Sequence, residues 1–126
     1  MNAKTEIRAT VERLGTLMFE RNPGLADEFA PAAMLVGSEP GEVADGREAI
    51  RALIAGLHAR ADRYTWAWDR LDISAAGSVG WFCAEGAPVV TAATGTTRHA
   101  YRLSGVLERS GARWLWRLFH GSEPRV

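Results

Sequence analysis

The chain of 126 residues is long enough for one domain, residues 1–126, that buries roughly two-thirds of its unfolded surface. Its 15 Lys and Arg balance 15 Asp and Glu, so no net field favours nucleic acid or an anionic membrane as a partner. The charged N-terminus lacks a signal-peptide pattern, and no stretch has the apolar length of a membrane span. A single cysteine, Cys83, excludes an internal disulfide, so we expect a cytoplasmic protein.

Two helices and a brief strand are predicted before residue 37. Apolar residues recur at helical spacing from about Ala3 to Arg21, where Asn22, Pro23 and Gly24 end the first helix. A short second helix is expected over Leu25 to Ala30. The apolar run Met34 to Val36 has the length of one brief strand.

An acidic turn and a third helix follow. Glu39 and Glu42 lie in the turn and could rim a cavity, although turn formation and capping also explain them. Asp45, with Glu48 three residues later, is typical of a capping box. The periodic apolar residues after it predict a helix to about Ala61.

The second half of the chain is predicted as antiparallel strands. Tyr64 to Ile73 and Val79 to Glu85 form one hairpin, and Arg98 to Pro124 forms another around a Ser110-Gly111 turn. Residues 87–97 could be a strand extension, a loop or a flexible rim. Helices followed by strands favour an α+β domain, with helices packed on one side of a curved sheet.

The turn at Ser110-Gly111 predicts how the last two strands divide between the faces of the sheet. Strict alternation groups these residues on one face: Tyr101, Leu103, Leu107, Trp114, Trp116, Leu118 and His120. The other face then carries Arg102, Ser104, Val106, Leu115, Arg117 and Phe119. Because neither face is fully polar, we expect helices to cover one and a partner subunit the other, in a homodimer through the sheet face.

Three residues are candidates for acid–base catalysis. Histidine is a common acid–base group, and His120 is predicted on the aromatic face, although a strand-end histidine can also bond a backbone carbonyl. Glu85 and Asp69 share a face with tryptophan in one register of the middle hairpin, where a carboxylate could act as a base. In the alternative, both point to solvent or pair with arginines such as Arg70 or Arg102.

Large side chains are the candidates for lining an apolar pocket. Aromatic residues with a polar edge suit that task, and the predicted ligand-binding set is Met18, Trp66, Trp68, Trp81, Tyr101 and Trp116. Core packing is the alternative role of Trp66 and Trp68. Arg102 and Arg117 could bind a ligand carboxylate or form interfacial ion pairs. The three histidines lack metal-ligand spacing, so no metal and no cofactor are expected.

The order of elements and two segments resemble the nuclear transport factor 2-like superfamily, and within it the SnoaL-like proteins. FAPAAMLVGSEPGEVADGREAIRAL, Phe29 to Leu53, is similar to that family's strand, acidic loop and helix start, and WLWRLFHGS, Trp114 to Ser122, to its terminal strand. The resemblance implies a cone-shaped, strongly curved antiparallel sheet wrapped by three N-terminal helices, a cystatin-like α+β roll with a cavity. Its members include ketosteroid isomerases, polyketide cyclases, dehydratases and assembly domains, so the fold does not select one chemistry.

We therefore expect a domain that binds a small apolar molecule. If it is an enzyme, the resemblance implies a cofactor-independent isomerase, cyclase or dehydratase that acts by proton transfer on a hydrophobic carbonyl compound. The resembling isomerases carry a catalytic tyrosine on the first helix, whereas the tyrosines here are Tyr64 and Tyr101. The alternative is a non-catalytic ligand-binding or oligomeric assembly module.

Overall fold

A computed structural model describes residues 2–124 and has an α+β fold. The expected curved sheet with three helices is confirmed. In chain order the elements are α1 (Ala3–Phe19), the 3-10 helix η1 (Pro23–Glu28), β1 (Phe29–Val36), β2 (Val43–Asp45), α2 (Arg47–His58), β3 (Arg63–Ala76), β4 (Val79–Ala92), β5 (Gly95–Arg98), β6 (Tyr101–Ser110) and β7 (Arg113–Ser122).

The strands form one sheet in the order β2-β1-β7-β6-β4-β3, with β5 paired to the end of β4. All neighbours are antiparallel except β1 and β7, which run parallel, so the sheet is mixed. This pairing brings the first strand of the chain beside the last. No helix within residues 2–124 has both the length and the apolar character needed to cross a membrane.

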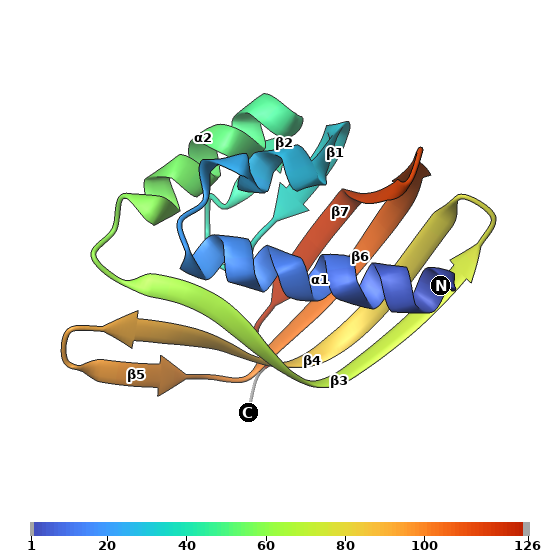
Figure 1. The fold of residues 1–126 in the computed structure, drawn as a ribbon. Helices are drawn as coiled ribbons and strands as arrows, with labels where there is room; N and C mark the ends of the chain where they lie inside the picture. The colour runs from blue at the N-terminus through green and yellow to red at the C-terminus, as the bar shows by residue number, and fades with distance from the viewer. Residues whose placement is uncertain (1, 125–126) are drawn as a thin grey trace.

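All the helices lie on one side of the sheet, which we call the inner face (Figure 1). Helix α1 crosses that face, and its apolar stripe, which includes Ile7, Val11 and Leu14, is fully buried. Helix α2 lies over β1 and β2, and buries Ile50 and Ile54. Burial of apolar surface between helices and sheet is the main stabilising contribution to such a fold.

Two β-bulges in the antiparallel pairings, one in β3 and one in β7, interrupt the alternation of side chains and increase the bend of their strands. In β3, Trp68 pairs with Gly86 and Arg70 with Glu85, which leaves Asp69 as the extra residue. In β7, Trp116 pairs with Leu107 and Leu118 with Val106, which leaves Arg117 as the extra residue. Beyond each bulge, the inward-facing positions are shifted by one residue along the strand. Residues that strict alternation would place on the inner face therefore lie on the opposite face.

The bulge in β7 corrects the predicted faces of the last strand. Phe119 is buried on the inner face, whereas Leu118 is half-buried and His120 is exposed on the opposite, outer face. The prediction from strict alternation is wrong for these three residues, because it placed Leu118 and His120 on the same face as Trp116, and Phe119 on the other face. The turn also differs, because Ser110 pairs with Arg113 and the loop residues are therefore Gly111 and Ala112.

The start of α2 differs from the predicted capping box. Asp45 belongs to β2, and the N-cap is Gly46 with φ of 93°, a conformation that favours glycine. No side chain caps this helix end. The pairing of β2 with β1 uses Asp45 as a strand residue, so it is unavailable as a cap.

Residues 87–97 form the end of β4, a turn and most of β5. Val89, Val90 and Thr91 of β4 pair with β3 on one side and with β5 on the other. The three strands extend beyond the helices as an arm, visible at the lower left of Figure 1. Of the three conformations expected for this segment, the strand extension is confirmed.

Candidate functional site

An apolar cavity of about 70 Å³ lies between the helices and the inner face of the sheet. Residues from both layers meet there, among them Met18 of α1, Leu57 of α2 and Trp66 of β3. Its remaining walls are Leu14, Leu25, Phe29, Leu35, Gly37, Glu42, Leu53, Ile54, Tyr101 and Phe119. Because the lining is almost entirely apolar, the cavity suits hydrocarbon.

A larger hollow of about 470 Å³, which we call the vestibule, adjoins this cavity and opens to solvent. The two share Met18, Glu42, Leu57, Trp66 and Tyr101 as lining residues. The arm supplies one wall of the vestibule through Tyr64, Thr65, Pro88 and Val90, and the turn after β1 supplies another through Ser38, Glu39 and Pro40. The polar groups are therefore gathered at the mouth of an apolar pocket.

Tyr101 lies at the junction of the two hollows with only 6% of its surface exposed. It occupies this position because Gly121, opposite on β7, has no side chain, and a Cβ there would overlap the tyrosine hydroxyl. Burial raises the pKa of Tyr101 to about 12, and the negative charges of Glu42 and Glu123 add to the increase. The hydroxyl therefore stays protonated at neutral pH and can donate a hydrogen bond.

Glu42 places a carboxylate at the same junction. Its Oε1 accepts a hydrogen bond from the backbone N–H of Glu39 at 2.9 Å, and its carbonyl oxygen accepts one from Gly37 at 2.7 Å. The side chain lies against Gly37, where a Cβ would be closer than van der Waals contact allows. A tight turn and a glycine thus hold this carboxylate in place.

Two further polar pairs line the vestibule. The imidazole Nε2 of His99 lies 2.5 Å from Oε1 of Glu123. A guanidinium nitrogen of Arg60 donates to the hydroxyl of Tyr64 at 3.5 Å. Sequence reasoning missed His99 and Glu123, which lie outside the strands and come together only because β6 pairs with β7.

The structure brings some of the predicted ligand-binding residues together at the cavity. Met18, Trp66 and Tyr101 line both hollows. Trp68 stacks on Trp66 with ring centroids 6.4 Å apart, as expected for residues that share a face. Trp116 is completely buried beneath Phe119 and lines neither hollow, so its position supports packing.

Trp81 and the three predicted catalytic residues lie away from the cavity. Trp81 is 45% exposed, and Glu85 lies 3.5 Å from Arg102 in an exposed ion pair, the alternative weighed for this carboxylate. Asp69 is the exposed extra residue of the β3 bulge, and His120 is exposed on the outer face. The expected grouping of His120 with the inner aromatic residues is therefore wrong, and the catalytic roles stay predictions.

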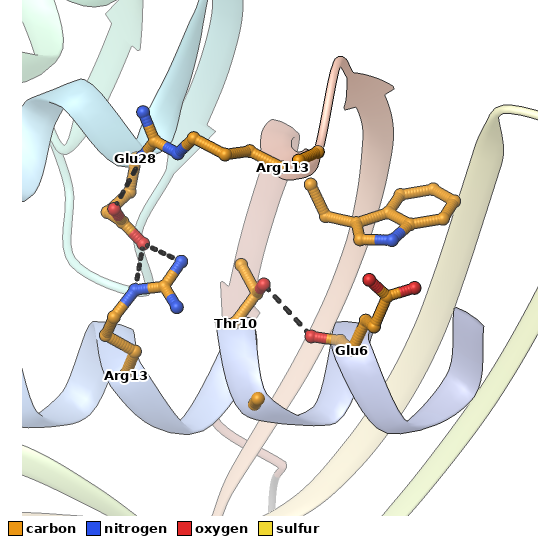
Figure 2. Close-up of a pocket in the computed structure, with 8 residues that line it drawn as sticks. Glu6, Thr10, Arg13, Glu28 and Arg113 are labelled. Carbon is orange, nitrogen blue, oxygen red and sulfur yellow. Dashed lines mark hydrogen bonds and ion pairs between the residues drawn. The ribbon is translucent and has the colours of Figure 1, made fainter. Parts of the chain in front are cut away.

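Another hollow, of about 380 Å³, lies between α1 and the turn before β7. Figure 2 shows the buried carboxylate of Glu28 in this hollow, held between the guanidinium groups of Arg13 and Arg113. Arg13 Nε donates at 2.8 Å and Arg113 donates at 2.9 Å. Because each oxygen of the buried carboxylate accepts a hydrogen bond from an arginine, the arrangement ties η1 to α1 and β7 and resembles a structural ion pair more than a ligand site.

The outer face of the sheet presents a line of apolar side chains across four strands. Register places Trp81 beside Val106, Val106 beside Leu118, and Leu118 beside Met34. We call these four residues the apolar row, in which Trp81 is 45% and Met34 is 38% exposed. No helix covers this face within residues 2–124 (Figure 1). Cys83, two residues after Trp81 on β4, is also exposed.

Within residues 2–124, no three His, Cys, Asp or Glu side chains lie close enough together to hold a metal ion.

The helix-covered curved sheet defines the nuclear transport factor 2-like class of folds, and solved structures of that class superimpose closely. The sequence model of the SnoaL-like domain matches residues 7–125, so the chain belongs to the SnoaL-like family. None of the curated proteins matches this chain.

Three solved structures illustrate the similarity. A protein from Catenulispora acidiphila, in complex with S-DNPA, has a TM-score of 0.83 and 21% identity over 95% of this chain and 92% of that one. A candidate dehydratase from Streptomyces avermitilis has a TM-score of 0.84 and 13% identity, over 98% and 97% of the two chains. A candidate calcium/calmodulin-dependent protein kinase II association domain from Xanthomonas campestris has a TM-score of 0.84 and 19% identity, over 100% and 91%. At these identities the similarity defines the fold alone.

Proposed function

We propose that the protein binds a small, largely apolar molecule, with its apolar end in the inner cavity and its polar end in the vestibule. The observation that carries this proposal is that two hollows of about 70 and 470 Å³ share five lining residues. Together they reach the size of a small-molecule site, about 300–1,000 Å³. A relative of the same fold has been solved with a small molecule bound.

Native mass spectrometry of gently purified protein tests this binding. Leu57 lines both hollows, so Leu57→Trp should fill the junction and abolish a bound adduct or added ligand. Ala52→Trp is the matched control, because Ala52 is exposed on the same helix. An adduct that persists in Leu57→Trp would contradict binding at this junction.

For the catalytic form of this function, we propose cofactor-independent proton transfer on a hydrophobic carbonyl compound, as in isomerases, cyclases or dehydratases. The protonated hydroxyl of Tyr101 would donate a hydrogen bond to the substrate carbonyl oxygen and stabilise the charge that develops there. The carboxylate of Glu42, at the same junction, would remove a proton from the adjacent carbon. The solved relative described as a candidate dehydratase supports this class of reaction.

Exchange of the α-protons of cyclohexanone in D₂O, followed by NMR, tests the proton transfer. Glu42→Gln and Tyr101→Phe should each slow the catalysed exchange about 100-fold or more, the usual size of an acid–base or oxyanion contribution. Glu12→Gln is the comparison variant and should keep the rate, because Glu12 is exposed on α1 and lines neither hollow. His120→Gln and Glu85→Gln test the catalytic roles predicted from the sequence, and a loss of rate in either would contradict Glu42 as the base. No acceleration by the wild-type protein would favour the alternative, a non-catalytic ligand-binding or assembly module.

We also propose that two copies associate through the apolar row to form a homodimer. Contiguous apolar side chains on an uncovered sheet face are typical of an interaction surface. Trp81→Glu should shift the mass measured by sedimentation equilibrium from dimer to monomer. Val43→Glu is the control, because Val43 is 59% exposed on β2 outside the row. A wild-type monomer would exclude this interface.

A further inference from the structure

Negatively charged side chains outnumber positively charged ones around the vestibule. Glu39, Glu42 and Glu123 contribute three carboxylates, and Arg60 contributes one guanidinium. The only other group there that can carry a positive charge is His99, which is already paired with Glu123. Even with that imidazole charged, carboxylates outnumber cations by three to two, so the vestibule is electronegative.

The negative charge reaches the point where the polar end of a ligand would lie. Glu42 lines the inner cavity as well as the vestibule. The charges of Glu42 and Glu123 both raise the pKa of Tyr101, which shows that their field acts at the junction. A partly enclosed, apolar setting strengthens such a field relative to bulk water.

Aromatic side chains stand beside these carboxylates. Tyr64, Trp66 and Tyr101 line the vestibule from two strands, and Trp66 and Tyr101 continue into the cavity. Aromatic faces attract cations through their quadrupole, and a nearby carboxylate adds a charge of the right sign. The same combination repels a carboxylate head group.

We propose that this site selects ligands with an apolar tail and a cationic amine head, and rejects carboxylates of the same shape. The inference rests on the proposed binding function and adds the charge class of the ligand. The end of the tail enters the cavity of about 70 Å³, which holds roughly two or three carbon-sized groups, and the rest of the tail lies along the apolar residues that the two hollows share. The ammonium group lies in the vestibule, near Glu42 and the aromatic walls.

Three probes with the same six-carbon tail separate charge from apolar binding: hexylamine, hexan-1-ol and hexanoate. Each is titrated at pH 7 into protein labelled with ¹⁵N, and the indole signal of Trp66 reports occupancy of the site. We expect the Kd of hexylamine to be about tenfold lower than that of hexan-1-ol, and hexanoate to be the weakest. Added salt should weaken hexylamine binding and leave hexan-1-ol unchanged, because only the former depends on charge.

Glu42→Gln removes the charge but keeps the oxygen that accepts from Glu39, so the turn should survive. In this variant the preference for hexylamine over hexan-1-ol should fall several-fold. Glu12→Gln is the matched control, because Glu12 is exposed on α1 and lines neither hollow.

The outcomes separate this inference from the function on which it rests. Equal or tighter binding of hexanoate would overturn the charge selection and leave the apolar pocket standing. An unchanged preference in Glu42→Gln would also overturn it. If none of the probes shifts the Trp66 signal, the binding function itself fails.

Discussion

The buried hydroxyl of Tyr101 makes the stability of the fold depend on alkaline pH. Its pKa rises from the ordinary value of 10.0 to about 12 on folding, chiefly because of burial. Between these two values the unfolded chain loses the proton and the folded chain keeps it, so the free energy of unfolding falls as pH rises. By pH 11 the free energy of unfolding should have fallen by roughly 1–2 kcal/mol, because each pH unit between the two pKa values lowers it by about 1.4 kcal/mol.

Urea unfolding at pH 9 and pH 11 measures this loss, and Tyr101→Phe isolates it from other titrations. The wild-type protein should lose roughly 1–2 kcal/mol more than the variant between the two pH values. Absorbance at 295 nm gives a second readout, because the tyrosinate signal of Tyr101 should appear only near pH 12. Equal losses in both proteins would show that the hydroxyl is open to water, and would remove the basis for its role as a donor.

Two further predictions concern charged groups outside the pocket. Glu28→Gln should lower the free energy of unfolding by about 1–3 kcal/mol, because it weakens hydrogen bonds from two arginines to a buried carboxylate. Glu85 belongs to an exposed ion pair, so Glu85→Gln should lower the free energy of unfolding by less than about 1 kcal/mol. Similar losses in the two variants, measured by urea unfolding, would contradict this contrast between a buried and an exposed carboxylate. Burial, together with the charge of Arg21, lowers the pKa of His58 below 6.5, so stability should fall as pH drops below that value. His58→Gln should flatten this acid dependence in thermal unfolding.

The layout of the fold could be predicted because it depends on local patterns. The apolar stripes of α1 and α2 and the two-residue alternation of the hairpins specify their own elements. The short strand β2 could not be predicted, because it exists only through its pairing with β1. The parallel contact of β1 with β7 joins residues that are far apart in the sequence, such as Phe29 and Trp116, and local patterns do not encode such a contact.

The sequence predicted the kind of site, an apolar pocket, but only some of the residues that line it. Met18, Trp66 and Tyr101 were identified as pocket residues, since large side chains on the helix-covered face meet there. Among the polar groups, Glu39 and Glu42 were considered as residues that could rim a cavity, and both line the vestibule. His99 and Glu123 were missed, because they lie outside the strands at positions that depend on strand pairing. The spacing of apolar residues in the sequence indicates both bulges. Inward residues are two positions apart up to Trp68 in β3, and the next one, Leu71, comes three positions later. In β7 the same step of three separates Trp116 from Phe119.

The bulge at Arg117 determines which residues of β7 lie on the inner face before it and which lie there after it. Before it, Trp114 and Trp116 lie inside, and after it the inner position passes to Phe119. The extra residue therefore leaves the cavity lined by an aromatic ring while His120 faces outward. Since a bulge also bends its strand, the same residue contributes to the curvature that creates the hollow.

Deletion of Arg117 tests this account of β7. With that residue removed, strict alternation still places Trp116 and Phe119 on the inner face, so the shortened chain should fold and keep its near-ultraviolet circular dichroism. Its strand should be flatter, and binding at the vestibule should weaken. Deletion of Leu115 is the disruptive comparison, because it removes a buried leucine, makes Trp114 and Trp116 adjacent and forces one of these buried rings outward. That variant should not fold, and equal unfolding of both deletions would refute the role of the bulge.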